Sequence, residues 1–228
     1  MTINLETFQL DTFALYAGSH SPNGHACFME AASQLANERW SDHPACVSPV
    51  IAAFGRSWND SLPDADRTRL LKPFVLKVIG TNTGPEDDEI RAWMACDWLV
   101  RTFTPVWLRK AGLADDAAAL ENLGELTTSG LVDEALPMIR EARKSADAAW
   151  AAAWDAVRDA AGDAAGAAAW DAAGAAVRDA AWAAAGAAAG AAAWAAAGDA
   201  AGAALADTVT ELQASASDLL DRMCAVGA

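Results

Sequence analysis

A four-residue repeat occupies the C-terminal part of this 228-residue chain. Residues 146 to 205 divide into 15 units in which the third position is always Ala, and the fourth is Ala except at Val157, Val177 and Leu205. The second position is Ala or Asp, and the first carries Trp, Arg, Gly or Ala. These 60 residues include 36 Ala, so the tract offers few large aliphatic side chains for a hydrophobic core.

The repeat predicts helix. Ala has the highest helix propensity of all residues and is depleted in strands, so helix is strongly favoured over a β-solenoid. Each Gly in a helix interior costs about 1 kcal/mol relative to Ala. We therefore expect bends or ends at the pairs Gly186 and Gly190, and Gly198 and Gly202. The tract should form several helical pieces that turn at glycines and pack together.

Tryptophan recurs at the first position of the repeat, at Trp150, Trp154, Trp170, Trp182 and Trp194. Four residues turn a helix by about 400°, so this column drifts by about 40° per unit and the indoles do not share one face. Three interpretations follow. The tryptophans are structural or nearly neutral products of a repeat expansion, they form a stacking surface for a planar, nucleotide-like ligand, or they contact a partner protein.

The sequence outside the repeat is typical of an all-α protein. Ser48 and Pro49 predict the start of a helix, as do Pro63 with Asp64, and Pro85 with the four acidic residues after it. Pro105 should end or kink the helix that starts at Pro85. Further helices are expected near residues 26–38, 114–123, 131–145 and 206–224, and no alternating strand pattern is found.

These elements suggest three segments. Residues 1–140 should form a helical globular domain whose core includes Trp40, Trp58, Trp93, Trp98 and Trp107. Residues 141–206 form the Ala-rich tetrapeptide-repeat helical region, and residues 207–228 form a C-terminal helix. The predicted architecture is therefore an N-terminal helical domain followed by a helical repeat region.

The charge is strongly acidic. The chain has 31 acidic and 16 basic residues and a formal net charge of -15, which argues against a nucleic-acid backbone as partner. Residues 146–228 hold 11 of the acids and only three of the bases. An acidic surface of this kind either imitates DNA towards a basic protein or keeps an Ala-rich region in solution.

Membrane insertion is not expected. Ala180 to Gly198 is a run of 19 residues without charge, but it contains none of the Leu, Ile, Val or Phe whose insertion is favourable. The N-terminal residues lack a basic segment followed by an apolar run, so no secretory signal is predicted. We expect a cytoplasmic protein.

Metal-binding residue types gather between residues 20 and 60, which hold all three His and two of the four Cys. His25, Cys27, His43 and Cys46 form a candidate zinc set, because neutral imidazole and thiolate are ligands that zinc prefers. Their spacing, H-x-C and then H-x-x-C, matches no familiar finger pattern. The alternative is that the two cysteines are small buried hydrophobes, and no cofactor is then needed.

Acidic residues in the same segment are the weak catalytic candidates. Glu30, Asp42 and His43, with Glu38 and Asp60 nearby, could act as acid, base or metal ligands in a metal-dependent hydrolase. Asp42 is equally well explained as a turn cap before His43. The chain has no nucleophile motif, phosphate loop or HExxH sequence, so catalysis is the alternative and binding is the first expectation.

The stretch CFMEAASQLANERWSDHPACVSPVIAAFGRSWNDSLPDADRTRLLKP, about residues 27–73, resembles a segment found in uncharacterised proteins of high-GC bacteria and their phages. Some of those proteins also carry Ala-rich C-terminal repeats. The resemblance implies no activity and no catalytic residue. It implies a role in phage and host conflict, through binding of a defence protein or a signalling nucleotide.

The expected function is therefore non-enzymatic binding of a partner protein or a small planar ligand. A metal-dependent hydrolase is one alternative. A structural protein that associates with itself as a homo-oligomer is the other.

Overall fold

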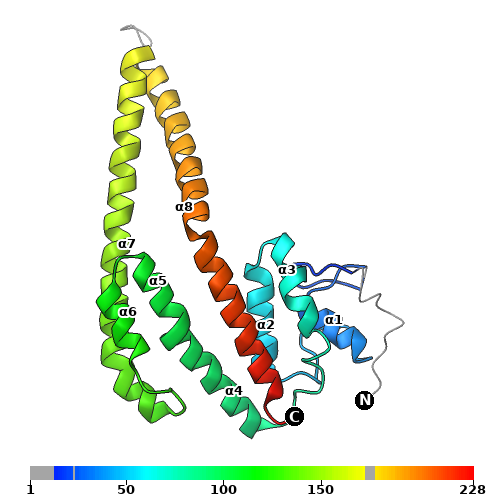
Figure 1. Cartoon of the computed structure of the whole chain (residues 1–228). Coiled ribbons are helices and arrows are strands. Elements are labelled where there is room, and N and C mark those ends of the chain that lie inside the picture. Colours follow the sequence, from blue (N-terminus) through cyan, green and yellow to red (C-terminus); the bar gives the residue numbers. More distant parts are fainter. Residues whose placement is uncertain (1–12, 23, 173–177) are drawn as a thin grey trace. The chain divides into compact units, whose positions relative to one another are not determined.

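The computed structural model describes residues 13–22, 24–172 and 178–228, and the side chains of these residues except at 150 and 153–201. Almost all regular structure in this part of the chain is helical (Figure 1). The one β feature among the described residues is an isolated bridge between Leu15 and Ala26. The prediction of an all-α protein is confirmed at this level.

The helices follow one another along the chain as α1 (Phe28–Leu35), α2 (Pro49–Ser61), α3 (Asp64–Leu71), η1 (Lys72–Phe74), α4 (Pro85–Trp98), η2 (Leu99–Phe103), α5 (Thr104–Lys110), α6 (Ala114–Glu121), α7 (Ser129–Ala172) and α8 (Arg178–Ala225).

Local sequence chemistry explains where several helices start. Ser48 is the N-cap of α2, and its hydroxyl oxygen accepts a hydrogen bond from the Ile51 amide at 3.5 Å, with Pro49 in the first turn. Helix α4 begins at Pro85, with three acidic residues in its first turn, where the helix dipole favours negative charge. The starts predicted at Pro49 and Pro85 are confirmed.

The helical pitch changes immediately before Pro105. Helix α4 is followed without a break by the π-helical turn η2 and then by α5, in which Pro105 lies in the first turn. Proline lacks an amide hydrogen, and its ring clashes with the carbonyl group four residues earlier in a regular α-helix. A wider π turn at this point gives the ring room. The sequence predicted an end or a kink here, and the structure has a change of helix type.

The repeat runs through two long helices. Helix α7 passes Gly162 and Gly166 with helical backbone, and α8 passes all four glycines of the pairs at 186 and 190 and at 198 and 202. The predicted helix ends at those pairs are therefore wrong. Ala surrounds each Gly, and this strong helix former outweighs the cost of about 1 kcal/mol that each Gly adds.

The described chain forms two compact units, which are interleaved in sequence. Unit 1 contains the described residues up to Leu99, together with Gly124–Asp133 and Leu212–Ala228. Unit 2 contains Val100–Leu123 and the described residues of Glu134–Glu211. The three sequence segments predicted above remain a prediction about domains, since these units follow a different division.

Unit 1 has a core drawn from both ends of the chain. Phe28, Met29 and Ile51 are fully buried in it, together with Leu219 and Leu220 of α8. Three of the expected core tryptophans, Trp40, Trp58 and Trp98, pack against this core while partly buried. The end of α8 therefore completes a core that begins in α1 and α2.

A buried arginine holds the end of α8. The Arg91 side chain is 0% exposed, and it donates from Nε to the Met223 carbonyl at 3.1 Å and from a terminal nitrogen to the Val226 carbonyl at 2.7 Å. Its other terminal nitrogen pairs with Asp88 at 3.1 Å. Gly227 follows with φ of 73°, a left-handed conformation typical of the residue after a helix end. A charged donor thus satisfies one carbonyl of the last turn of α8 and one just beyond its end.

Unit 2 has a smaller core. Leu108 of α5, Ala117 and Leu120 of α6, and Ala142 of α7 are buried together, and partly buried apolar side chains pack around them. Arg109 and Glu121 form an ion pair between α5 and α6. Short side chains contribute two of the four buried residues of this core.

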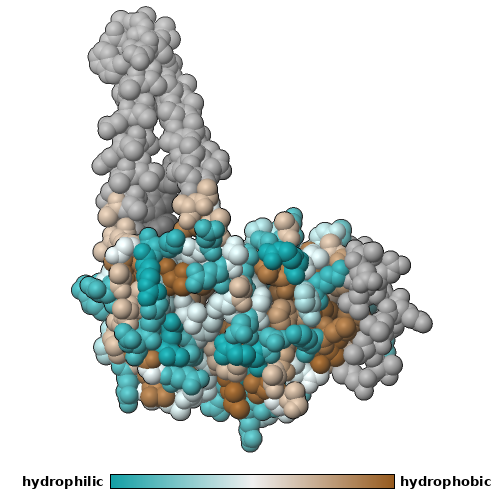
Figure 2. Space-filling view, viewed as in Figure 1, coloured by the Kyte–Doolittle hydropathy of each residue, from teal (hydrophilic) through white to brown (hydrophobic). Residues whose placement is uncertain are grey.

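On the face drawn in Figure 2, hydrophilic side chains are interspersed with small apolar patches over the described residues. Within the described part of the chain, no helix combines the length and apolar character needed to cross a bilayer.

Candidate functional site

Glu30 is the first of the sequence-predicted catalytic candidates, and it is buried in unit 1. It lies in the first turn of α1, and its side chain is 1% exposed. One carboxylate oxygen accepts a hydrogen bond from the His20 amide at 2.5 Å, and the other accepts one from the Cys27 amide at 2.8 Å. The second oxygen also lies 3.0 Å from His20 Nδ1.

These contacts fix the charge of Glu30. Burial alone would raise the pKa of its carboxyl group, but hydrogen bonds from the Cys27 and His20 amides and the His20 ring lower it further than burial raises it. The net effect is a pKa below the ordinary value, so Glu30 is ionised at neutral pH. Glu30 therefore acts as an anchor that joins the loop at His20 to the start of α1.

His20 is a site residue that the sequence analysis missed. Its backbone carbonyl accepts a hydrogen bond from the Trp40 indole at 2.6 Å, and its ring lies 6.2 Å from the His25 ring. His25 in turn packs on Tyr16, with ring centroids 4.2 Å apart. No sequence spacing marks this cluster, because the course of the loop brings its members together.

Asp42 and His43, the other catalytic candidates, form a pair on the surface of unit 1. His43 Nδ1 lies 2.7 Å from Asp42 Oδ1, and the His43 side chain is 67% exposed. Arg56 donates to the Asp42 carbonyl at 2.9 Å. His43, Arg56 and Asn82 line a hollow of about 270 Å³. The other two acids in the segment accept main-chain hydrogen bonds, Glu38 from Ala45 and Asp60 from Gly18.

The four residues of the candidate zinc set are not brought together as a metal site. His25 packs on an aromatic ring, His43 lies on the surface, and the two thiols are buried in the core of unit 1. Among the residues that the structure describes, no three His, Cys, Asp or Glu side chains converge in an arrangement that could hold a metal ion.

The state of the two thiols agrees with a structural role. Burial raises the pKa of Cys27 to about 12 from an ordinary value of 9.0, and burial together with the neighbouring Glu38 raises the pKa of Cys46 to about 12. These pKa values keep both groups protonated at neutral pH. Cys27 and Cys46 therefore behave as small buried hydrophobes.

The tryptophans of the repeat lie outside what the structure describes at the side-chain level. Trp150, Trp154 and Trp170 belong to α7, and Trp182 and Trp194 belong to α8. Their candidate role in stacking on a planar ligand stays a prediction.

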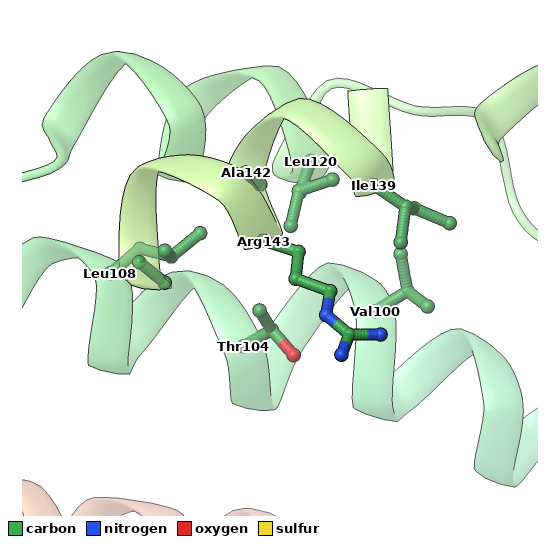
Figure 3. A pocket seen from close by; sticks show the side chains of 8 residues that line it. Val100, Thr104, Leu108, Leu120, Ile139, Ala142 and Arg143 are labelled. Carbon is green, nitrogen blue, oxygen red and sulfur yellow. The ribbon is translucent and has the colours of Figure 1, made fainter. Parts of the chain in front are cut away.

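A cavity in unit 2 is a site that the sequence analysis did not select. It measures about 260 Å³ and lies among α5, α6 and α7, together with Val100 of η2. Its walls are mostly apolar and are formed by Val100, Leu108, Leu120, Ile139, Ala142 and Ala146 (Figure 3). The cavity exists because Ala142 and Ala146, two small residues one turn apart on α7, face larger side chains of α5 and α6.

Two polar side chains lie at this cavity, Thr104 of α5 and Arg143 of α7. Figure 3 shows the Arg143 side chain extending from α7 so that its guanidinium group lies between Thr104 and Val100. The Arg143 side chain is 83% exposed, so the guanidinium group is at the solvent-facing rim of the cavity. The arrangement combines an apolar interior with one cationic group at its edge.

Comparisons of the chain with protein-family models, with curated proteins and with solved structures found no match. The resemblance of residues 27–73 to phage and bacterial proteins therefore stays a prediction.

Proposed function

We propose that this chain functions by binding a small, largely apolar ligand, and that the cavity of unit 2 is the binding site. The observation that carries the proposal is the cavity itself, with its volume of about 260 Å³ and its apolar walls. A dry apolar cavity of about 150 Å³ is sufficient to bind benzene. The larger space in unit 2 suits a planar body of two fused rings.

The polar side chains of unit 1 favour binding over catalysis, because their contacts are structural. The Glu30 carboxylate accepts main-chain hydrogen bonds that fix the start of α1. Asp42 pairs with the His43 ring, and the Arg56 guanidinium donates to the Asp42 main chain. Each of these side chains has a local structural partner that accounts for its position.

We also propose that the tetrapeptide repeat forms a helical region distinct from the core of unit 1. Support comes from the helical backbone of α7 and α8 over most of residues 146–205. In this proposal the cavity lies where α7 enters the repeat, because Ala146 both lines the cavity and opens the first tetrapeptide.

Calorimetric titration with naphthamide, a neutral bicyclic probe, tests the site. We expect the wild-type protein to bind it with a Kd in the micromolar to millimolar range, as suits a small ligand. Ala146→Leu should abolish binding by filling the cavity. Ala148→Leu makes the same change at an exposed position of α7 and should leave binding unchanged.

The proposal fails if wild-type protein takes up no naphthamide at millimolar concentration. It also fails if Ala146→Leu, with its circular dichroism spectrum and melting temperature preserved, binds as well as the wild type.

A further inference from the structure

Arg143 is positioned to meet a charged group of whatever occupies the cavity of unit 2. Its guanidinium group lies at the rim beside Thr104, while the remaining lining is apolar (Figure 3). Arg143 Nε lies 3.8 Å from Asp147 Oδ2, and both side chains are largely exposed. An exposed pair of this kind at positions i and i+4 is weak. A carboxylate held at the cavity rim would therefore compete well for the guanidinium group.

The surroundings of the cavity are much less acidic than the chain as a whole. Residues 100–123 and 134–146, which provide all its walls, contain six basic and five acidic residues. The whole chain has a formal net charge of -15. An anion at the rim thus meets a nearly neutral local segment, and the nearest lining charge is positive.

The number of cations at the rim limits the class of anion. Among the described lining residues, Arg143 is the one basic side chain. A single guanidinium group matches one carboxylate through two parallel hydrogen bonds. A phosphate dianion carries more charge and is usually met by several donors or by a helix N-terminus.

We propose that the ligand of this cavity is an amphipathic monocarboxylate, whose ring system fills the apolar interior and whose carboxylate pairs with Arg143. This inference rests on the proposed function, because it assigns a chemical class to the ligand of the same cavity. The apolar body supplies most of the affinity, and the guanidinium group selects the acid over its neutral counterpart.

The test compares naphthoate with naphthamide, which share a ring system and differ in charge, by calorimetric titration of the full chain. Wild-type protein should bind naphthoate about fivefold more tightly than naphthamide, the preference expected for a partly exposed ion pair. The preference should fall as salt is raised, because salt screens exposed charges.

Substitutions on α7 assign the preference to one side chain. Arg143→Met keeps an apolar stem of similar length and should remove the preference, so that naphthoate and naphthamide bind to this variant with similar affinities. Arg140→Met, on the same helix but outside the cavity lining, should retain it. If Arg143→Met weakens both probes, Arg143→Lys should restore the preference for naphthoate.

The outcomes separate the two proposals. Three results would overturn the carboxylate inference and leave the apolar site standing. The first is equal affinity of the wild type for both probes, and the second is a preference for naphthoate that survives Arg143→Met. The third, relevant if Arg143→Met weakens both probes, is failure of Arg143→Lys to restore the preference. Absence of binding by either probe would overturn both.

Discussion

Replacing Arg91 with Met tests whether a buried guanidinium group holds the end of α8 in unit 1. Met preserves most of the side-chain volume but removes every donor. The carbonyl groups of Met223 and Val226 then lose a charged partner, and Asp88 loses its ion pair. The Met223 carbonyl still accepts a hydrogen bond from the Val226 amide at 3.4 Å, whereas loss of the Arg91 donor at the Val226 carbonyl costs about 1–3 kcal/mol. With the broken ion pair included, we expect the free energy of unfolding of unit 1 to fall by about 3–5 kcal/mol.

The loss is measured best by hydrogen exchange, because a chain with two compact units does not guarantee a single unfolding transition. Hydrogen exchange at increasing urea concentrations, read by mass spectrometry, should report the stability of peptides from residues 212–226 separately from that of peptides from unit 2. Arg222→Met makes the same change on the exposed face of α8, where Arg222 pairs with Asp218, and should cost less than about 1 kcal/mol. Arg91→Lys keeps the charge without the forked donors and should fall between these two variants. The reasoning is refuted if Arg91→Met and Arg222→Met destabilise these peptides equally.

Two further predictions concern ionisable groups of unit 1. Because the pKa of Glu30 is lowered in the folded state from an ordinary value of 4.5, its contribution to stability is complete above that pH and is lost as the pH falls through the lowered pKa. Urea unfolding at pH 7, 4 and 3 should show this loss, and the acid-dependent part of the unfolding free energy should shrink in Glu30→Gln. The variant should also lose about 1–3 kcal/mol at pH 7, because one main-chain amide that donates to the Glu30 carboxylate is left without an acceptor. An unchanged acid dependence in Glu30→Gln would contradict the assignment. Because burial raises the pKa of Cys27 and Cys46 to about 12, iodoacetamide at pH 8 should alkylate both far more slowly in folded protein than in urea, as read by peptide mass spectrometry. Rapid labelling of either thiol in the folded protein would disprove its burial.

Local signals were sufficient to predict several helices. Ser48 before Pro49, and Pro85 before a run of acids, mark helix starts through capping and the helix dipole, which act within one turn. Helix ends at the glycines of the repeat were predicted wrongly, because a single-residue propensity was given more weight than the alanines on either side. The sequence contains that balance, but it must be summed over a window to be seen.

Long-range placement could not be predicted in the same way. The spacing of Leu212, Leu219 and Met223 indicates an apolar helix face, but it does not say that Leu219 and Met223 join the core that contains residues of α1 and α2. His20 and Glu30 are likewise ten positions apart, and the course of the loop that precedes α1 is defined by no short pattern. The cavity of unit 2 depends on Ala142 and Ala146, which look like the many other alanines of α7 until their neighbours are known.

The attachment of the end of α8 to unit 1 also bears on how the chain is made. A ribosome that has just completed α4 has produced most of the core of unit 1 but none of Leu219, Leu220 and Met223, which fill the rest of it. At about 5–20 residues per second, the 125 residues from position 99 to position 223 take roughly 6–25 s to synthesise. During that interval the apolar surfaces of α1 and α2 are accessible to chaperones and to neighbouring nascent chains. Translation speed through the repeat therefore sets the time for which the nascent N-terminal helices must be kept from aggregating.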